Sequence, residues 1–427
     1  MLIKSVIINK EDALRDDKTK TKQCKVCGRE LPLDNFRKIY NKAYVNTCIE
    51  CQGRILSEKK QQKRLANGEV VEVAMIERKF KKISFDQVLH KNVSGISHIA
   101  RDEKFVRILD CKHSWGSNYG RVIVKDDDGV YRLLKPSRSR TTGELSYTLC
   151  KNIYIKSKNE FGHKKEKVLA RDLVIKLFII NYDMKNNTEC WRMNGDVEDN
   201  YYKNLYPVTQ LQYQEIKNRS EKNGFVTEDE IIEIVNQEEY KPEEWKARYY
   251  NRTYNGVGYM GGRVDYKSDA WSRWTNMMQR CYNKKVLKKK PEYRGCRVCE
   301  EWQNFQNFKI WYDDHCLRGR KVDLDKDLLG RYGKLYSPET CSFITHFLNT
   351  VFERRNITIK KDKDGMYSAK MSIVNKIHDI GTFETEEEAM DAFIEYKKNY
   401  IAKLAESYKG KIQDCVYDAM MSWDIAA

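Results

Sequence analysis

Polar and apolar residues alternate most regularly near the end of the chain. The stretch KDGMYSAKMSIVNKIHDIGTF, residues 363–383, switches between the two classes across tight turns indicated at DKDG and VNK. A period of two predicts half-buried strands. The following residues, 384–400, have apolar side chains at helical spacing, Thr385 as N-cap, acidic residues in the first turns and lysines near the end. Residues 357–412 are therefore predicted to form a three-stranded sheet followed by a helix.

Periodic spacing elsewhere predicts further small modules. Residues 115–137 are interpreted as short strands around turns, and residues 168–179 have apolar side chains at helical spacing. Residues 221–254 predict one or two helices, acidic at first and basic later, which we interpret as a spacer. We expect an α+β protein built as a multi-domain string of small modules. The expected boundaries are 1–60, 61–92, 93–220, 221–254, 255–356, 357–412 and 413–427, the last segment being a tail.

Two CxxC pairs stand near the start of the chain, separated by 20 residues. Their four thiolates can close a tetrahedral shell around one metal ion, and the spacing is typical of structural zinc sites. A segment this short buries little apolar surface, so the metal is expected to supply its folding free energy. Redox or unligated cysteines are the alternative. The sequence predicts a zinc ribbon over 1–60, followed by a basic linker helix over 61–92. The expected Zn²⁺ ligands are Cys24, Cys27, Cys48 and Cys51.

Charge narrows the class of partner. The chain has 427 residues, with 79 Lys+Arg against 62 Asp+Glu and a formal net charge of +17. This excess favours a polyanion such as nucleic acid, because neutralising phosphates releases condensed counterions, although a merely solvated basic surface is the alternative. No export signal and no apolar run of about 18 residues is present, so no membrane partner is expected. Thirteen cysteines in such a chain favour reduced thiols. We expect a cytoplasmic monomer, either in a cell of its own or in an infected host cell.

Residues 93–220 end in WRMNGDVEDNYYKNLYPVTQLQYQEIKN (191–218), of which residues 191–213 align without gaps to a nuclease motif. The segment resembles the phage and intron-encoded HNH homing endonucleases. That resemblance implies a ββα fold around one divalent metal, with a histidine that polarises the attacking water. Here Trp191 stands at the first metal position, Arg192 at the base position and Tyr213 at the second metal position. These side chains are poor ligands and a poor base. The resemblance therefore implies a retained fold with cleavage lost, and nucleic-acid contacts from Trp191, Arg192, Asn204 and Tyr213.

Residues 255–356 carry the blocks WSRWTNMMQRCY, VCEEW and LDKD…YSPETC. They resemble a second HNH-like phage family. Laid on the motif, Asp325 takes the first metal position, Lys326 the base position and Asn349 the last ligand position. The resemblance allows Mg²⁺ between Asp325 and Asn349, with His346 as a substitute base; a DNA-binding scaffold without cleavage is the alternative. The further CxxC pair, Cys296 and Cys299, is either a second zinc site or a pair of buried thiols, with Trp302, Phe305, Phe308 and Trp311 forming the core beside it.

The C-terminal sheet and helix resemble the DNA-binding domain of plant ethylene-response factors, in which the sheet enters the major groove. The resemblance implies nucleic-acid contacts from strand residues, with a plain α+β packing module as the alternative. The matching strand residues include Tyr367, Lys370, Lys376 and His378.

Three functions follow from the sequence. The first is a phage-type HNH homing-endonuclease-like protein that binds DNA through several modules, with cleavage weak or lost. The second is a non-catalytic binder of RNA or a ribonucleoprotein, because a zinc ribbon and tyrosines serve RNA equally well. The third is a phage inhibitor of a host complex.

Overall fold

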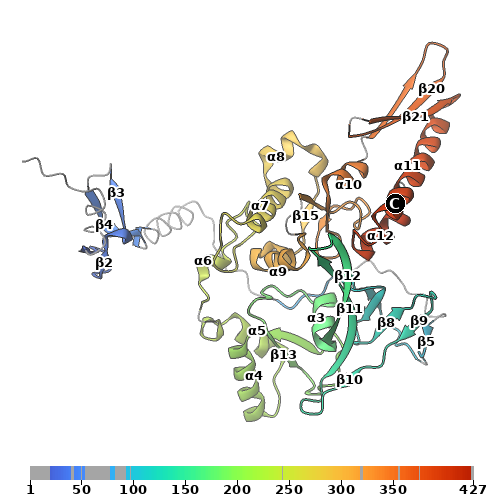
Figure 1. The fold of residues 1–427 in the computed structure, drawn as a ribbon. Coiled ribbons are helices and arrows are strands. Elements are labelled where there is room, and N and C mark those ends of the chain that lie inside the picture. Colours follow the sequence, from blue (N-terminus) through green and yellow to red (C-terminus); the bar gives the residue numbers. More distant parts are fainter. Residues whose placement is uncertain are drawn as a thin grey trace, which may run out of the picture. The chain divides into compact units, whose positions relative to one another are not determined.

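A computed structural model of the chain describes residues 20–39, 43–49, 51–52, 77–81, 93–96, 98–242, 244–317, 321–353, 356–374 and 376–424. These residues form several small sheets with helices between them, so the expected α+β class built from small modules is confirmed (Figure 1). The chain divides into two compact units, 1–74 and 75–427. Most of the expected linker helix, 61–76 and 82–92, lies outside the described residues. Among the described helices, none is long and apolar enough to cross a membrane.

The first unit consists of two antiparallel hairpins. One pairs β1 (Thr21–Gln23) with β2 (Glu30–Pro32), and the other pairs β3 (Phe36–Ile39) with β4 (Ala43–Cys48). Its buried core consists of Phe36 and three cysteines. A core this small leaves folding dependent on something other than apolar burial.

The second unit begins with a five-stranded sheet in the order β5-β9-β8-β7-β6. The bounds are β5 (Val93–Ser94), β6 (Phe105–Arg107), β7 (Ser114–Ser117), β8 (Val122–Lys125) and β9 (Tyr131–Leu133). A second sheet follows, made of β10 (Ser137–Arg138) and the long hairpin β11 (Leu145–Ile155) and β12 (Glu160–Leu169). Helix α3 (Ala170–Phe178) buries Leu173, Val174, Leu177 and Phe178 in the shared core. This matches the strands and the helix expected over 115–137 and 168–179.

A hairpin and a helix complete this part of the chain. Strand β13 (Glu189–Arg192) pairs with β14 (Leu205–Val208), and α4 (Gln210–Asn223) follows directly after a capping box at Thr209. The expected spacer contains α5 (Glu228–Asn236) and the short α6 (Ala247–Tyr250). Helix α5 buries Ile231, Ile234 and Val235 against the same core as Ile216 of α4. The spacer is therefore partly packed onto the module that precedes it.

The next part repeats the hairpin–helix order within a helical shell. Strand β16 (Val322–Asp325) pairs with β18 (Ser342–Thr345), which leads into α10 (His346–Val351). Strand β15 (Arg297–Val298) pairs with β17 (Leu335–Tyr336), and the helices are α7 (Asp269–Tyr282), α8 (Lys284–Lys289) and α9 (Phe305–His315). The aromatic block expected at helical spacing is confirmed as core: Trp302, Phe305, Phe308 and Trp311 are all buried.

A second zinc site is not found in the described part of the chain, where the only group of metal-binding geometry is the N-terminal one. Cys296 is buried in the same apolar core as Cys281 and Cys341. Burial raises the pKa of the Cys299 thiol well above its usual value. Buried, protonated thiols behave as small apolar side chains. This favours the interpretation of the CxxC pair as buried thiols over that as a second zinc site.

The C-terminal part has the expected three-stranded antiparallel sheet, β19 (Ile357–Lys361), β20 (Tyr367–Ile373) and β21 (Lys376–Phe383), with α11 (Glu386–Tyr408) lying along it (Figure 1). Thr385 caps α11 through a capping box with Glu388. Residues 413–427 were expected to be a tail, and this was wrong. Residues 414–421 form α12 (Asp414–Met421), whose side chains Cys415, Val416 and Met420 are buried against α11. The apolar spacing in this short segment is that of an ordinary amphipathic helix.

Buried polar contacts join the two hairpin–helix parts of the second unit. Asn307 is fully buried; its Nδ2 donates to Asn181 O (2.8 Å), and its Oδ1 accepts from Met184 N (2.8 Å). Asn304 Nδ2 donates to Tyr182 O (2.8 Å). Lys81 Nζ lies 2.8 Å from a carboxylate oxygen of Glu301. These parts of the chain are therefore packed against one another and are not independent modules joined by a flexible linker.

Burial of Lys397 in α11 is expected to lower the free energy of unfolding, and this can be tested. Its side chain is fully buried, Nζ donates to Glu353 O (2.9 Å), and burial lowers its pKa to about 8. The unfolded chain, with the ordinary pKa of 10.5, binds this proton more tightly. Folding stability therefore rises with pH between about 8 and 10.5, and the cost is fully present below 8. We expect Lys397→Met to increase the free energy of unfolding at pH 7 by about 1–3 kcal/mol.

Urea unfolding of the two proteins at pH 7 and at pH 10 measures this difference, which should shrink at the higher pH. Lys398→Met is the matched control, because Lys398 is half-exposed beside Asp424. A gain of equal size at both pH values, or an equal gain in the control, would contradict the assignment.

Candidate metal centre and hairpin–helix sites

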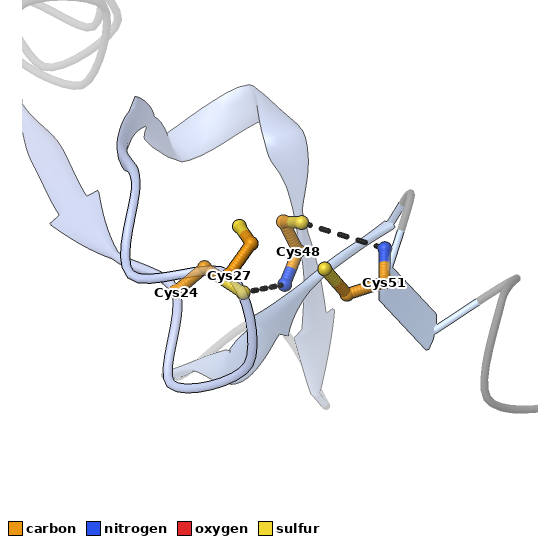
Figure 2. A group of neighbouring side chains, drawn as sticks. All are labelled: Cys24, Cys27, Cys48 and Cys51. Atoms are coloured by element: carbon orange, nitrogen blue, oxygen red, sulfur yellow. Dashed lines mark hydrogen bonds between the residues drawn. The ribbon is translucent and has the colours of Figure 1, made fainter.

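The four N-terminal cysteines lie together, as expected. Their sulfur atoms are all within 4.8 Å of one another, and three of the four side chains are buried. Figure 2 shows Cys24 and Cys27 on the first loop, facing Cys48 and Cys51 at the end of β4. Gly28 follows the first pair with φ +70°. It closes the loop by donating its N–H to Cys24 O (2.9 Å), in a conformation that glycine adopts without a steric cost.

Backbone donors point at the sulfur atoms. Cys48 N–H donates to Cys24 Sγ (3.3 Å) and Cys51 N–H donates to Cys48 Sγ (3.5 Å). The bond from Cys48 lowers the pKa of the Cys24 thiol to about 6, whereas burial raises the pKa of Cys51 to about 12. Four thiolates this close repel one another unless a cation lies between them. The donor set can hold a metal such as zinc, and four sulfur ligands leave no open position for a substrate, which is typical of a structural site.

The first hairpin–helix site is filled by its own side chains. Arg192 is 7% exposed, and its guanidinium donates to both carboxylate oxygens of Glu144 (3.0 and 2.8 Å) and to Asn200 Oδ1 (3.2 Å). The Trp191 and Tyr213 rings meet edge to face with centroids 5.6 Å apart, packed against the core. Both Nη atoms of Arg192 are paired and its Nε is buried without a partner, so the guanidinium exposes no donor to a phosphate in this structure. Trp191 and Tyr213 keep only part of their surface exposed.

Asn204 also has an internal partner for each polar atom. Its Nδ2 donates to Asn194 Oδ1 (2.8 Å) and to Asp199 O (3.0 Å), and its Oδ1 accepts from Asn194 N (3.0 Å). The side chain holds the loop between β13 and β14. The expected nucleic-acid contact is replaced by this structural role, because a buried amide with saturated hydrogen bonds has nothing left to offer a ligand.

The second site keeps the expected register. In each hairpin, the residue just before the helix N-cap pairs with a residue of the first strand. Trp191 and Asp325 each stand two positions after that paired residue, so they lie at equivalent places. Asp325 is nevertheless buried, and its Oδ2 accepts from the N–H groups of Asp327 (3.1 Å) and Leu328 (2.9 Å). Burial raises its pKa to about 6. Lys326 is buried as well and pairs with Asp327. Both residues hold the turn after β16, and neither lies free for catalysis.

Asp323, which the sequence motif did not indicate, is the residue that joins the remaining candidates. Its Oδ2 accepts from Asn349 Nδ2 (3.1 Å) and lies 2.7 Å from His346 Nδ1. Asn349 is thus paired with Asp323. The structure does not bring Asn349 and Asp325 together as the expected pair of Mg²⁺ ligands. The His346 side chain is 67% exposed. A carboxylate that holds one imidazole nitrogen leaves the other directed to solvent.

The strand residues of the C-terminal sheet divide between its two faces. The register pairs Met371 with His378 and Ile373 with Lys376, and Met371 and Ile373 are buried beneath α11. His378 Nδ1 lies 3.1 Å from Tyr396 OH of α11, so His378 is not available to a groove.

By alternation along the strands Tyr367 and Lys376 lie on the same side as Met371 and Ile373, but Lys376, at the end of the hairpin, is exposed. Lys370 faces away from α11, beside Asp379 (3.3 Å). Of the four expected contacts, only Lys370 lies on the face that α11 does not cover, because successive side chains of a strand point to opposite faces.

Comparisons with known proteins do not decide the family. No protein-family model matches the chain, and no curated protein or solved structure matches it significantly. The resemblance to HNH endonucleases is therefore a resemblance of sequence motifs alone.

Proposed function

We propose that this protein is a phage-type, HNH homing-endonuclease-like DNA-binding protein whose first hairpin–helix module serves as scaffold. The observation that carries the proposal is the repeated β–β–α unit, at β13–β14–α4 and β16–β18–α10, each with a threonine cap and with the motif residues in the same register. The net charge of +17 supports a polyanionic partner. In this proposal zinc stabilises the N-terminal ribbon and the exposed Lys370 face of the C-terminal sheet contributes phosphate contacts.

Binding of the full-length protein to fluorescent 30-base-pair DNA, duplex RNA and single-stranded RNA tests this proposal. We expect DNA to bind most tightly, with affinity falling steeply as salt rises, because each neutralised phosphate releases counterions. Lys370→Glu should weaken DNA binding, and Lys267→Glu is the control on another surface. Preference for RNA would favour the RNA-binding alternative. Failure to bind any nucleic acid, together with one stoichiometric host protein in pull-downs, would favour the inhibitor.

Cleavage by the second module is a further candidate, favoured by the hydrogen bond between Asp323 and His346 (2.7 Å). An imidazole oriented in this way can take a proton from an attacking water. If the module cleaves DNA, we expect His346→Ala to reduce nicking of a plasmid in Mg²⁺ or Mn²⁺ by roughly 10²–10⁴-fold. His98→Ala, an exposed histidine of another module, should cleave at the wild-type rate. No nicking by the wild type, or equal nicking by His346→Ala, removes catalysis from this site.

A further inference from the structure

A pocket of about 340 Å³ lies where the expected spacer meets the second hairpin–helix part. It is bordered by a loop after α3, by the segment that contains α6 and by a glycine-rich turn at 261–263. The sequence motifs did not indicate it. Its aromatic and cationic lining consists of Trp245, Tyr249, Tyr250, Lys185, Lys246 and Arg263.

Aromatic rings form one wall of the pocket. Trp245 stacks on Tyr250 with centroids 5.7 Å apart and planes at 26°. Tyr250 is fixed from behind, because its hydroxyl donates to Asp183 Oδ2 (2.5 Å) and its ring packs beside Tyr259 at 5.9 Å. A flat aromatic surface with a locked rotamer suits stacking of a planar ligand at low entropic cost.

Positive charge surrounds the same opening. Lys185 is paired with Glu244 (3.3 Å), the one carboxylate among the lining residues that the structure describes, while Lys246 and Arg263 have exposed side chains. The pKa of the Tyr249 phenol is lowered, first by a hydrogen bond from Arg248 and further by the charges of Lys246 and Arg263. The potential at the opening therefore favours an anion.

The glycine-rich turn lines part of the pocket and is held in place by hydrogen bonds. Gly261 has φ +65° and donates its N–H to Tyr249 O (2.9 Å). A Cβ at this position would collide with the Asn304 amide, so only glycine fits. Gln306 Nε2 holds the turn by donating to Arg263 O (2.8 Å). The turn is thus fastened to both α6 and α9.

We propose that this pocket binds one unstacked nucleotide, with its base on the Trp245–Tyr250 wall and its phosphate beside Lys246 and Arg263. The volume is at the small end of ligand pockets, roughly 300–1,000 Å³, which restricts the occupant to a small molecule or to one residue of a polymer. An inorganic anion would not use the aromatic wall, and an apolar side chain would not use the cations. A free mononucleotide and an extrahelical nucleotide in a DNA strand share this chemistry. Binding of an extrahelical nucleotide in a DNA strand, unlike binding of a free mononucleotide, rests on the proposed function.

The test uses the full-length protein and two sets of probes. Isothermal titration measures binding of AMP, GMP, CMP and UMP. Fluorescence anisotropy compares a fully paired DNA duplex with the same duplex carrying a single-nucleotide bulge. The variants are Trp245→Ala, Trp245→Phe and Lys246→Ala, with Phe225→Ala as control, because Phe225 is 65% exposed in the same spacer and does not line the pocket.

We expect Trp245→Ala to weaken binding of the bulged duplex on the order of 5- to 100-fold, the usual effect of losing one stacked base. Trp245→Phe should retain most of the affinity, which excludes misfolding as the cause, and Lys246→Ala should weaken binding and lower its salt dependence. Binding of the paired duplex should not change. Loss confined to mononucleotide binding identifies a free nucleotide as the ligand.

Equal binding of both duplexes by wild type and Trp245→Ala, with no mononucleotide binding, overturns the pocket while leaving the proposed function standing. Mononucleotide binding that is lost in Trp245→Ala, in a protein that binds no DNA, upholds the pocket and overturns the proposed function. Absence of all binding overturns both.

Discussion

Removing zinc from the full-length protein is expected to unfold residues 20–52 and to leave residues 75–427 folded. The ribbon buries little besides Phe36 and its cysteines, so we expect a bound metal to supply most of its stability. Structural zinc contributes apparent free energies of about 10–16 kcal/mol at pH 7 in small zinc-dependent folds. All eight tryptophans lie after residue 75. Their fluorescence should therefore stay constant while a chelator exposes the ribbon to protease.

The matched variants separate metal ligation from loss of a thiol in general. Cys48→Ser should reduce bound zinc from one ion per chain to a small fraction, as measured by elemental analysis. Cys150→Ser, which alters a half-buried cysteine outside the cluster, should retain one ion. Equal zinc content in the two variants would be incompatible with the four-cysteine site.

Breaking the buried ion pair beneath the first hairpin–helix module is expected to have the second largest effect. Glu144 accepts from Arg192 and also from Arg171 (2.8 Å), and all three side chains are largely buried. In Glu144→Gln, Arg192 loses its counter-charge inside the protein, whereas Arg171 keeps its ion pair with Asp172 (3.3 Å). Removing one partner of a buried pair usually costs about 3–5 kcal/mol. We expect a loss of this size in the free energy of unfolding, followed by tryptophan fluorescence in urea.

Glu198→Gln is the control for this change, because Glu198 forms an exposed ion pair with Arg138 (2.5 Å). Exposed pairs contribute about 0–1 kcal/mol, so the same substitution should be almost neutral there. A small effect at Glu144 would mean that Arg192 is not held in its buried position, and the residue would return to the candidates for phosphate contact.

Local patterns were sufficient to predict the local structures. The two CxxC pairs, the alternating strands before Thr385 and the helical spacing of Trp302 to Trp311 depend on neighbours within a few residues. Each of these elements is present in the structure. The order β–β–α at both motifs is the one that the resemblance to HNH endonucleases implies. The coarse fold could therefore be predicted without knowledge of its long-range contacts.

The site assignments depended on contacts that the sequence does not display. Arg192 is neutralised by Glu144, which stands 48 residues earlier. His378 faces Tyr396 because the register of β20 and β21 turns it toward α11. Asn349 bonds to Asp323 and not to Asp325, two residues further along the same strand. Side-chain partnership across 18 or more residues is set by packing, and a motif aligned residue by residue does not contain that information.

The buried amides Asn304 and Asn307 have a mechanical consequence for any bound duplex. They fasten the loop after α3 to the second hairpin–helix part through buried hydrogen bonds, so separating the two parts would leave buried amides unpaired. A duplex that contacts both parts would therefore have to bend to fit them as they are joined. Smoothly bending 20–30 base pairs by 40–90° costs on the order of 1–6 kcal/mol, depending on the sequence bent. For the proposed DNA complex, flexible pyrimidine–purine steps at the bend would then distinguish one target from another, even where no side chain touches a base.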